Sequence, residues 1–269
     1  MAGPLFELRD VRYAYHGKYP ALRGVSLSIE RGTRVALVGA NGTGKSTLLA
    51  MLDALIFPDG GAVLAMGKEL TAELFEDAGF SLEFRRRVGF VFQNPEVQLF
   101  CPTVEEDIAF GPLQLGAPVP EIRARLERLS SVFKLSDILG RAPHQLSVGE
   151  KRKVTLASVL AIEPEVLLLD EPTAGLDPQT VRDIIAVLLA EHGGGKTIVF
   201  ATHDLHLVEE FADVVHVMGP EKNLIRSAAP GDILLDQDFL EMNNLVHIHA
   251  HRHADMLHIH AHRHSRRGA

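Results

Sequence analysis

Alternation between apolar and polar residues predicts two strands at the start of the chain, over residues 5–15 and 25–30, that pair as an antiparallel unit. Residues 34–38 form a short, almost wholly apolar run that suits a buried strand. The period then changes, because the apolar positions between residues 45 and 57 recur at helical spacing, and Pro58 would end such a helix. The chain therefore begins with β-structure and passes from a buried strand directly into a helix.

Residues 80–160 have a different texture, with helical stretches such as residues 121–133 between proline-containing loops. Strands and helices alternate again after this region. Further elements are expected over residues 166–169 (strand), 180–191 (helix), 197–201 (strand) and 214–218 (strand). This order predicts an α/β protein with a mostly parallel core sheet, an N-terminal antiparallel β subdomain and an inserted helical subdomain at about residues 94–160, with ligands at the carboxyl ends of the strands.

Composition indicates a globular protein outside the membrane. The 269 residues are 46% hydrophobic and 23% charged, which is ordinary for soluble domains. The longest uncharged apolar run, residues 154–162, is far shorter than the ~20 residues that span a bilayer. We expect neither a membrane span nor a secretory leader. The single cysteine, Cys101, cannot form an internal disulfide and suits a reducing compartment.

Charge sets the end of the chain apart. Four arginines and one aspartate give residues 247–269 a net charge of +3, so the overall −8 leaves −11 on the rest of the chain. An acidic body argues against a broad nucleic-acid-binding face. We therefore expect one main domain over residues 1–241 and a distinct histidine-rich tail over residues 242–269.

A phosphate-binding loop is predicted between the buried strand and the first helix. Residues 39–46 read Gly-Ala-Asn-Gly-Thr-Gly-Lys-Ser and match GxxxxGK[ST] in the strand-loop-helix context that its mechanism requires. The three glycines let the backbone close around phosphates, and the helix N-terminus supplies N–H donors. Lys45 is expected to reach the β- and γ-phosphate oxygens, and Ser46 to bind Mg²⁺.

Two adjacent carboxylates follow the apolar strand at residues 166–169. A buried strand that ends in an acid delivers it to the edge of the sheet, beside the bound phosphates. Asp170 suits a Mg²⁺ ligand, and Glu171 suits a base that polarises the attacking water. Together with the glycine-rich loop, these residues predict a nucleotide-hydrolysing site.

Further motifs occur in order around these two and resemble those of ABC-type ATPases. Residues 146–150 (Leu-Ser-Val-Gly-Glu) resemble the LSGGQ signature of that family. Gln93, residues 175–177 (Gly-Leu-Asp) and residues 202–204 (Thr-His-Asp) match its Q-loop, D-loop and H-switch in order and approximate spacing. The resemblance covers roughly residues 5–240 and implies ATP and Mg²⁺ as cofactors and a dimer of ATPase subunits.

The resemblance also implies a role for each matching residue. Tyr15 would stack on adenine, and Tyr13 is the alternative residue for this role. Gln93 would touch Mg²⁺ or the lytic water, and His203 would contact the γ-phosphate. Signature residues would act in trans, on ATP held by the facing subunit. The catalytic set is Glu171, His203, Gln93 and Asp177; the nucleotide-binding set is Tyr15, Gly39, Asn41, Gly42, Thr43, Gly44, Lys45, Ser46, Thr47, Ser147, Gly149 and Glu150; the Mg²⁺ ligands are Ser46, Gln93 and Asp170.

Three positions depart from the family pattern. Val148 replaces the first glycine of the signature, which is tolerable only if its φ is below zero, and its β-branch would restrict the loop. Glu150 replaces the glutamine; at a helix start a carboxylate is favourable by ~0.3–1 kcal/mol, although this one would lie near an anionic nucleotide. Lys153 stands where the family usually has arginine. These departures bear on the turnover rate rather than on ATP binding.

A finer resemblance concerns residues 88–100 and 103–111, which are similar to the ATPase subunits of energy-coupling factor importers, closest to cobalt and nickel importers. Such importers take up vitamins or transition-metal ions through an integral membrane coupling subunit and a substrate-binding membrane subunit. The resemblance implies uptake of Ni²⁺ or Co²⁺ and a peripheral position at the cytoplasmic face of the cell (inner) membrane. A homodimer is favoured because one chain holds a full set of motifs.

The tail is a candidate metal site. Residues 247–253 (His-Ile-His-Ala-His-Arg-His) recur unchanged as residues 258–264. Neutral imidazole suits Ni²⁺, Co²⁺, Cu²⁺ and Zn²⁺, and alternate residues of an extended chain share one side. The candidate ligands are His247, His249, His251, His253, His258, His260, His262 and His264. Three interpretations are open: a metal-binding or metal-sensing tail, a solvated low-complexity tail, and a cloning-derived tag.

Three rival functions also stay open. The first is an importer of the same kind whose cargo is a vitamin, such as biotin or riboflavin. The second is a soluble, non-transport ABC ATPase acting on nucleic acid or ribosomes, which the acidic body disfavours. The third is a metal-storage module, which would lose its function if residues 247–269 were deleted.

Overall fold

Three β-sheets are present in the computed structural model, which describes residues 3–246, 248–253 and 256–261. The larger sheet has the strand order β10-β9-β3-β8-β7-β6 and the smaller has the order β2-β1-β4-β5. The strands of the larger sheet are β3 (Arg34–Val38), β6 (Val88–Val91), β7 (Val166–Asp170), β8 (Thr197–Thr202), β9 (Val214–Met218) and β10 (Leu224–Ala228). Those of the smaller sheet are β1 (Phe6–Tyr15), β2 (Tyr19–Ile29), β4 (Gly60–Ala65) and β5 (Lys68–Glu69). A separate pair consists of β11 (Ile248–His253) and β12 (Met256–Ala261).

Strand direction confirms the predicted fold class. Strands β9, β3, β8, β7 and β6 pair in parallel, and only β10 at the edge of this sheet is antiparallel to its neighbour. The smaller, N-terminal sheet is antiparallel throughout. Because parallel strands share a carboxyl edge, the residues that end or follow β3, β7 and β8 converge there. These residues are the predicted phosphate loop, the Asp170–Glu171 pair and His203.

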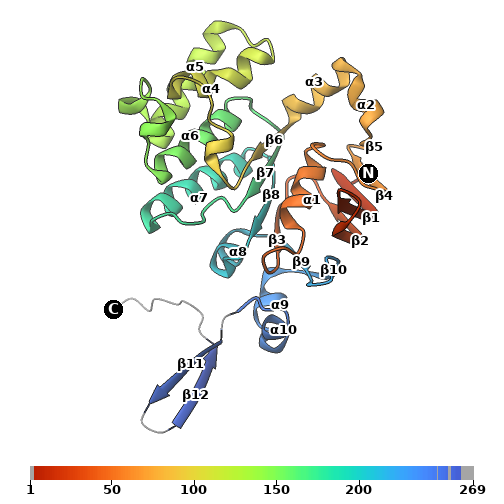
Figure 1. Cartoon of the computed structure of the whole chain (residues 1–269). Coiled ribbons are helices and arrows are strands. Elements are labelled where there is room, and N and C mark those ends of the chain that lie inside the picture. Colours follow the sequence, from red (N-terminus) through yellow and green to blue (C-terminus); the bar gives the residue numbers. More distant parts are fainter. Residues whose placement is uncertain (1–2, 247, 254–255, 262–269) are drawn as a thin grey trace.

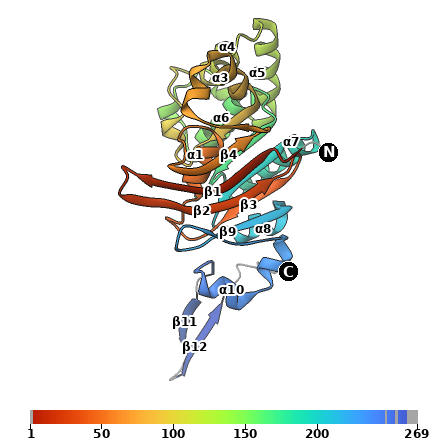
Figure 2. The same ribbon diagram turned by 90° about the vertical axis from the view of Figure 1, so that its right-hand side faces the viewer.

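Helices cover both faces of the larger sheet. The helices are α1 (Lys45–Leu52), α2 (Ala72–Glu76), α3 (Ala78–Arg87), α4 (Val104–Gln114), α5 (Val119–Phe133), α6 (Val148–Leu160), α7 (Pro178–Gly193), α8 (Leu205–Phe211), α9 (Pro230–Leu234) and α10 (Gln237–Met242), with short 3₁₀ turns η1 (Pro95–Val97), η2 (Ser136–Ile138) and η3 (Pro143–Gln145). Figure 1 shows α1 with the small sheet on one side of β7 and β8, and α6 and α7 on the other. Figure 2 shows α1 beside the small sheet.

Two hydrophobic cores follow from the alternation of side chains along the buried strands. In β3, Val35 and Leu37 join the core beneath α1, whereas Ala36 and Val38 join the core beneath α6 and α7. Helices α4, α5 and α6 pack on one another within this second core. The limits of the helical subdomain, and of the domain over residues 1–241, stay predictions. So does the metal site of the tail, for which His247, His262 and His264 lie outside the described residues. No helix in the described ranges has the length and hydrophobicity to cross a membrane.

The predicted helix over residues 45–57 is wrong beyond Leu52, where α1 ends. Ala54 takes a left-handed φ of 52°, which breaks the helix before Pro58. The Asp53 carboxylate and carbonyl both accept hydrogen bonds from Arg85 Nη1, at 3.0 and 2.7 Å, so a contact with α3 holds the chain where periodicity alone would continue the helix.

The first hairpin also differs from prediction. Strand β2 begins at Tyr19, well before residue 25, and so includes Pro20, which lies between the two predicted strands. This proline is tolerated because β2 is an edge strand of the small sheet, where one side of the backbone needs no partner.

We predict that His216 makes the fold sensitive to mild acid. This residue of β9 is 5% exposed, its Nδ1 lies 2.7 Å from Ser227 Oγ, and burial lowers its pKa to about 4. Below the pKa of an unfolded histidine, about 6.5, this residue is protonated in the unfolded chain but stays neutral in the folded protein. The free energy of unfolding therefore falls as the pH falls from about 6.5 toward 4. Between pH 7.5 and pH 5 the loss from this group should be about 2 kcal/mol.

Urea unfolding of the protein and of the His216→Gln variant at both pH values measures this loss. The variant keeps a hydrogen-bonding side chain but cannot titrate, so its stability should change less with pH by about that amount. Equal pH dependence in the two proteins would contradict the prediction.

Candidate functional site

The loop between β3 and α1 has a backbone that only glycine fits at two positions. A Cβ on Gly39 would lie 2.6 Å from the Met218 carbonyl oxygen, and one on Gly44, where φ is 102°, would lie 2.4 Å from that of Ala21. Gly44 also precedes α1 without a side-chain cap, which leaves the first N–H groups of the helix for a ligand. Gly42 (φ 82°) and the exposed Asn41 lie in the same loop.

Lys45 is buried and turned back into this loop. Its Nζ donates hydrogen bonds to the carbonyl oxygens of Gly39 at 2.7 Å and Ala40 at 3.2 Å. Thr43 Oγ1 donates to the same Ala40 oxygen at 2.9 Å. Burial lowers the pKa of Lys45, while the carboxylates of Glu171 and Asp170 oppose that shift. A buried ammonium held only by neutral carbonyls favours the arrival of an anion.

Asp170, at the end of β7, offers a free carboxylate oxygen. Burial raises its pKa, and the Ser46 hydroxyl opposes this shift. Among the described residues, its Oδ1 is fully buried and has no hydrogen-bond partner. An orphaned carboxylate oxygen beside a hydroxyl matches the oxygen ligands that Mg²⁺ prefers, so the donor set fits this ion.

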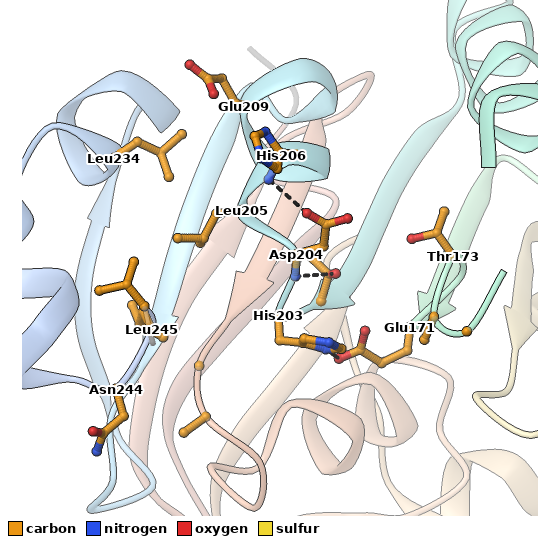
Figure 3. Close-up of a pocket in the computed structure, with 16 residues that line it drawn as sticks. Glu171, Thr173, His203, Asp204, Leu205, His206, Glu209, Leu234, Asn244 and Leu245 are labelled. Carbon is orange, nitrogen blue, oxygen red and sulfur yellow. Dashed lines mark hydrogen bonds and ion pairs between the residues drawn. The ribbon is translucent and has the colours of Figure 1, made fainter. Parts of the chain in front are cut away.

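Glu171 and His203 form the other half of the site. Glu171 Oε1 lies 2.8 Å from His203 Nδ1, and Figure 3 shows the two side chains meeting from separate strand ends. The Glu171 side chain is only 8% exposed whereas that of His203 is 66% exposed. Glu171 has a left-handed φ of 47°, held by a hydrogen bond of 3.0 Å from its N–H to the Ala201 carbonyl. Such backbone strain is concentrated at functional sites.

A pocket of about 470 Å³ opens in front of this pair (Figure 3). Gly39 of the phosphate loop, Glu171 and His203 all line it. Asp204 lines it too and caps α8 by accepting a hydrogen bond of 2.9 Å from the His206 N–H. Residues 244–246 form a further wall. Sequence reasoning missed these last residues, because nothing in their composition links a position after α10 to the catalytic edge of the sheet.

Tyr15 lies beside the start of α1. Its hydroxyl is 3.1 Å from Thr47 Oγ1, and its ring packs edge to face on that of Tyr13 with centroids 5.0 Å apart. The residue Tyr15 is 41% exposed. Tyr13 is the more buried of the two. The pair therefore places an exposed aromatic ring, that of Tyr15, next to the phosphate loop.

The signature residues lie on the opposite face of the sheet from α1. Ser147 and Glu150 form a capping box at the start of α6: the Ser147 N–H and hydroxyl each donate to Glu150 Oε2 at 2.7 Å. These bonds lower the pKa of Glu150. Val148 is the first residue of α6, is 60% exposed and does not have a positive φ, so valine is not strained there. Both substitutions thus fit a helix start.

The D-loop lies next to the signature helix. Asp177 caps α7 and accepts a hydrogen bond of 2.6 Å from the Thr180 hydroxyl, and a Cβ on Gly149 would lie 3.4 Å from that same hydroxyl oxygen. Lys153 bonds Asp183 of α7 at 2.9 Å. The structure therefore brings the signature together with the D-loop, but not with the phosphate loop of the same chain.

Arg152 is a site residue that sequence reasoning missed. It is 3% exposed, and its two Nη atoms donate to the carbonyl oxygens of Phe92 at 2.8 Å and Gln93 at 2.6 Å. It thereby fixes the backbone of Gln93, a residue that is itself exposed. The one signal in the sequence was a charged residue on the buried side of α6, which periodicity identifies only once the helix is known.

We predict that Arg152→Lys weakens both the fold and the reaction. Lysine cannot donate to two carbonyls in a fixed fork, so the variant should lose about 1–3 kcal/mol of unfolding free energy. Turnover at saturating ATP should fall several-fold, because Gln93 is no longer held. Urea unfolding and ATP hydrolysis measure the two effects, with the exposed Arg123→Lys as the matched control. A variant with unchanged turnover would contradict this positioning role.

Comparisons with known proteins agree with this geometry. A family model described as "ABC transporter" matches residues 22–174. The nickel import ATP-binding protein NikO of Rhodobacter capsulatus is 54% identical over 230 residues, which cover 84% of this chain and 89% of that protein. The energy-coupling factor transporter ATP-binding protein EcfA of Methanothermobacter thermautotrophicus is 42% identical over 241 residues, covering 90% and 76%.

Solved structures share the fold. The cbiO1 protein of Clostridium perfringens, part of the ABC transporter complex cbiONQ, superposes with a TM-score of 0.75 at 34% identity, covering 90% of this chain and 95% of that one. The ATP-binding cassette MJ0796, in a dimeric post-hydrolysis state bound to ADP and Pi, gives 0.75 at 27% identity, covering 84% and 98%. The chain therefore belongs to the ABC transporter family, as an ATP-hydrolysing subunit of the energy-coupling factor type.

Proposed function

We propose that this chain hydrolyses MgATP to drive an importer of Ni²⁺, bound at the cytoplasmic face of the inner membrane. The observation that supports Ni²⁺ as the cargo is the 54% identity, over 84% of this chain, with a nickel import ATP-binding protein. The Glu171–His203 pair, which faces the phosphate loop across one pocket, supports hydrolysis. Two membrane subunits, one for coupling and one for substrate binding, complete the importer in this proposal.

Nucleotide binding begins with the aromatic ring and the loop. Tyr15 stacks on adenine, since its exposed ring stands beside the loop and Tyr13 supports its edge. The backbone N–H groups from Gly39 to Thr47 surround the phosphates, and Lys45 exchanges its two carbonyl partners for phosphate oxygens. This exchange costs little because neutral acceptors are replaced by charged ones.

Ser46, Asp170 and the side chain of Gln93 would hold Mg²⁺, which neutralises charge on the β- and γ-phosphates when bound. The orphaned Asp170 oxygen supports this assignment. Glu171 then accepts a proton from the attacking water with the carboxylate oxygen that is not engaged by His203. The imidazole fixes the carboxylate through Oε1 and presents its other nitrogen to the γ-phosphate.

Two copies of the chain make two complete sites. The signature residues Ser147 and Gly149, with Glu150, lie on the face opposite to the phosphate loop, so they cannot close over ATP in their own chain but can do so over ATP in a facing copy. Asp177 lies beside Gly149 through Thr180 and would reach the same interface. A homodimer satisfies both halves from one sequence.

Cargo-dependent ATP hydrolysis by the purified complex with its membrane subunits tests this function. We expect Ni²⁺ in the range that saturates the transporter to stimulate turnover, with biotin and riboflavin having no effect. Stimulation by a vitamin instead of the metal would identify the vitamin as the cargo and leave the ATPase assignment intact. Hydrolysis that no membrane subunit influences would favour a non-transport ATPase.

A further inference from the structure

Lys153 joins α6, the helix that begins in the signature, to α7, the helix that follows the D-loop. Its Nζ donates a hydrogen bond of 2.9 Å to Asp183 Oδ2, and the two side chains are only 14% and 20% exposed. Salt screens such a partly buried ion pair much less than a pair on the open surface. The contact is therefore a specific link between the two helices.

Asp183 is also held from its own helix. Gln179 Nε2 donates to Asp183 Oδ1 at 3.0 Å, and Arg182 donates to Gln179 Oε1 at 2.8 Å. The ammonium of Lys134 lies 3.5 Å from Asp183 Oδ2. The hydrogen bonds from Lys153 and Gln179 lower the pKa of Asp183 to about 2. The carboxylate therefore stays ionised at neutral pH and offers Lys153 a negative charge in a fixed position.

A second contact between the two helices lies about one turn closer to the signature. A Cβ on Gly149 would lie 3.4 Å from the hydroxyl oxygen of Thr180, which is buried. The Thr180 hydroxyl donates to Asp177 at 2.6 Å and so connects this contact to the D-loop. Two contacts about one turn apart fix both the separation of the helices and their relative rotation. The signature and the D-loop of one copy therefore move together.

The D-loop leads back to the catalytic carboxylate through a short segment of turns. The Ala174 N–H donates to the Glu171 carbonyl at 3.3 Å. The Leu176 N–H donates to the Thr173 carbonyl at 3.4 Å. Glu171 and Thr173 are both buried. A segment this short and this well packed gives the D-loop little freedom to move apart from Glu171.

We propose that Lys153 is a positioning residue that links the two ATP sites of the dimer, because its bond to Asp183 ties the signature of each copy to the D-loop and to Glu171 of the same copy. The inference rests on the proposed homodimer, in which the signature of one copy lies over the ATP of its partner. When the signature engages that ATP, α6 moves α7 and the D-loop with it. Glu171 of the same copy then takes its working position, so hydrolysis at one site depends on ATP at the other.

Mixed dimers test this direction of coupling. Two full-length copies with different tags are purified together in ATP, and Glu171→Gln in one copy leaves a single working site. The first dimer has Lys153→Met on the copy with the intact Glu171. The second has it on the Glu171→Gln copy, whose signature serves the working site. Relative to a mixed dimer without Lys153→Met, we expect turnover to fall at least about threefold in the first dimer and to stay within about twofold in the second.

Two further variants and a matched control make the test specific. On the copy with the intact Glu171, Lys153→Arg keeps an ion pair with Asp183 and should restore turnover, whereas Asp183→Asn should reproduce the loss. The control is Lys196→Met on the same copy. Lys196 lies 3.5 Å from Glu191 near the other end of α7, with a side chain that is 17% exposed, so this variant loses a comparable ion pair and should keep turnover within about twofold.

Equal losses in the two mixed dimers would overturn the proposal, because Lys153 would then support the fold in general. A loss confined to the second dimer would overturn it too, since Lys153 would then act on the partner's ATP. An ATP-induced rise in the melting temperature of each variant shows that the chain is folded. Copies that do not purify together in ATP would contradict the homodimer and this inference with it, whereas the other outcomes leave the homodimer standing.

Discussion

Replacing Glu171 by glutamine is expected to abolish ATP turnover while leaving ATP bound. Glutamine fits the same buried position and can still hydrogen-bond His203, but it cannot accept a proton from water. Loss of a positioned general base lowers rates by about 10²–10⁴-fold, so turnover should fall at least about 100-fold. Because binding survives, ATP should hold two copies together as a stable dimer, which size-exclusion chromatography would detect.

A second carboxylate of the same pocket provides the control. Glu209 lines the cavity without touching the phosphate loop or His203 in any described contact, so Glu209→Gln should retain turnover within about twofold. A Glu171→Gln protein that hydrolyses ATP at more than a tenth of the parent rate would show that another group removes the proton.

Replacing Lys45 by alanine is expected to weaken ATP binding itself. A charged hydrogen bond to phosphate contributes about 1.5–3 kcal/mol, which corresponds to a loss of affinity of about 10- to 150-fold. The nucleotide-free protein should be little affected, within about 1 kcal/mol, because the native lysine is buried against neutral carbonyls and burial already lowers its pKa.

Thermal unfolding with and without ATP separates the two effects. At the same ATP concentration the melting temperature of Lys45→Ala should rise much less than that of the parent, while the melting temperatures of the two proteins without ATP stay close. The exposed Lys68→Ala variant should behave as the parent does. An ATP-induced shift of parental size in Lys45→Ala would mean that the loop backbone alone holds the phosphates.

Sequence reasoning succeeded where a local pattern has one structural solution. An apolar run followed by glycines and a helical period predicts a strand, a loop and a helix. The structure has β3 at the expected residues and begins α1 at the expected Lys45. The same holds for Glu171 and His203, because two parallel strands necessarily end at one edge of the sheet.

Three of the failures concern contacts between distant segments. Helix α1 ends early because Arg85, far along the chain, binds Asp53. Arg152 reads as an ordinary charged helix residue until its helix packs beside Gln93. The wall that residues 244–246 add to the catalytic pocket depends on how the chain returns after α10. None of these has a local signature, since each follows from tertiary packing rather than from propensity.

Uptake of radioactive nickel by vesicles that contain the whole importer tests nickel transport most directly. With ATP on the side of this chain, we expect Ni²⁺ to accumulate, accumulation to vanish with Glu171→Gln, and Glu209→Gln to transport as the parent does. Vesicles that hydrolyse ATP and accumulate biotin or riboflavin, but not Ni²⁺, would contradict nickel as the cargo.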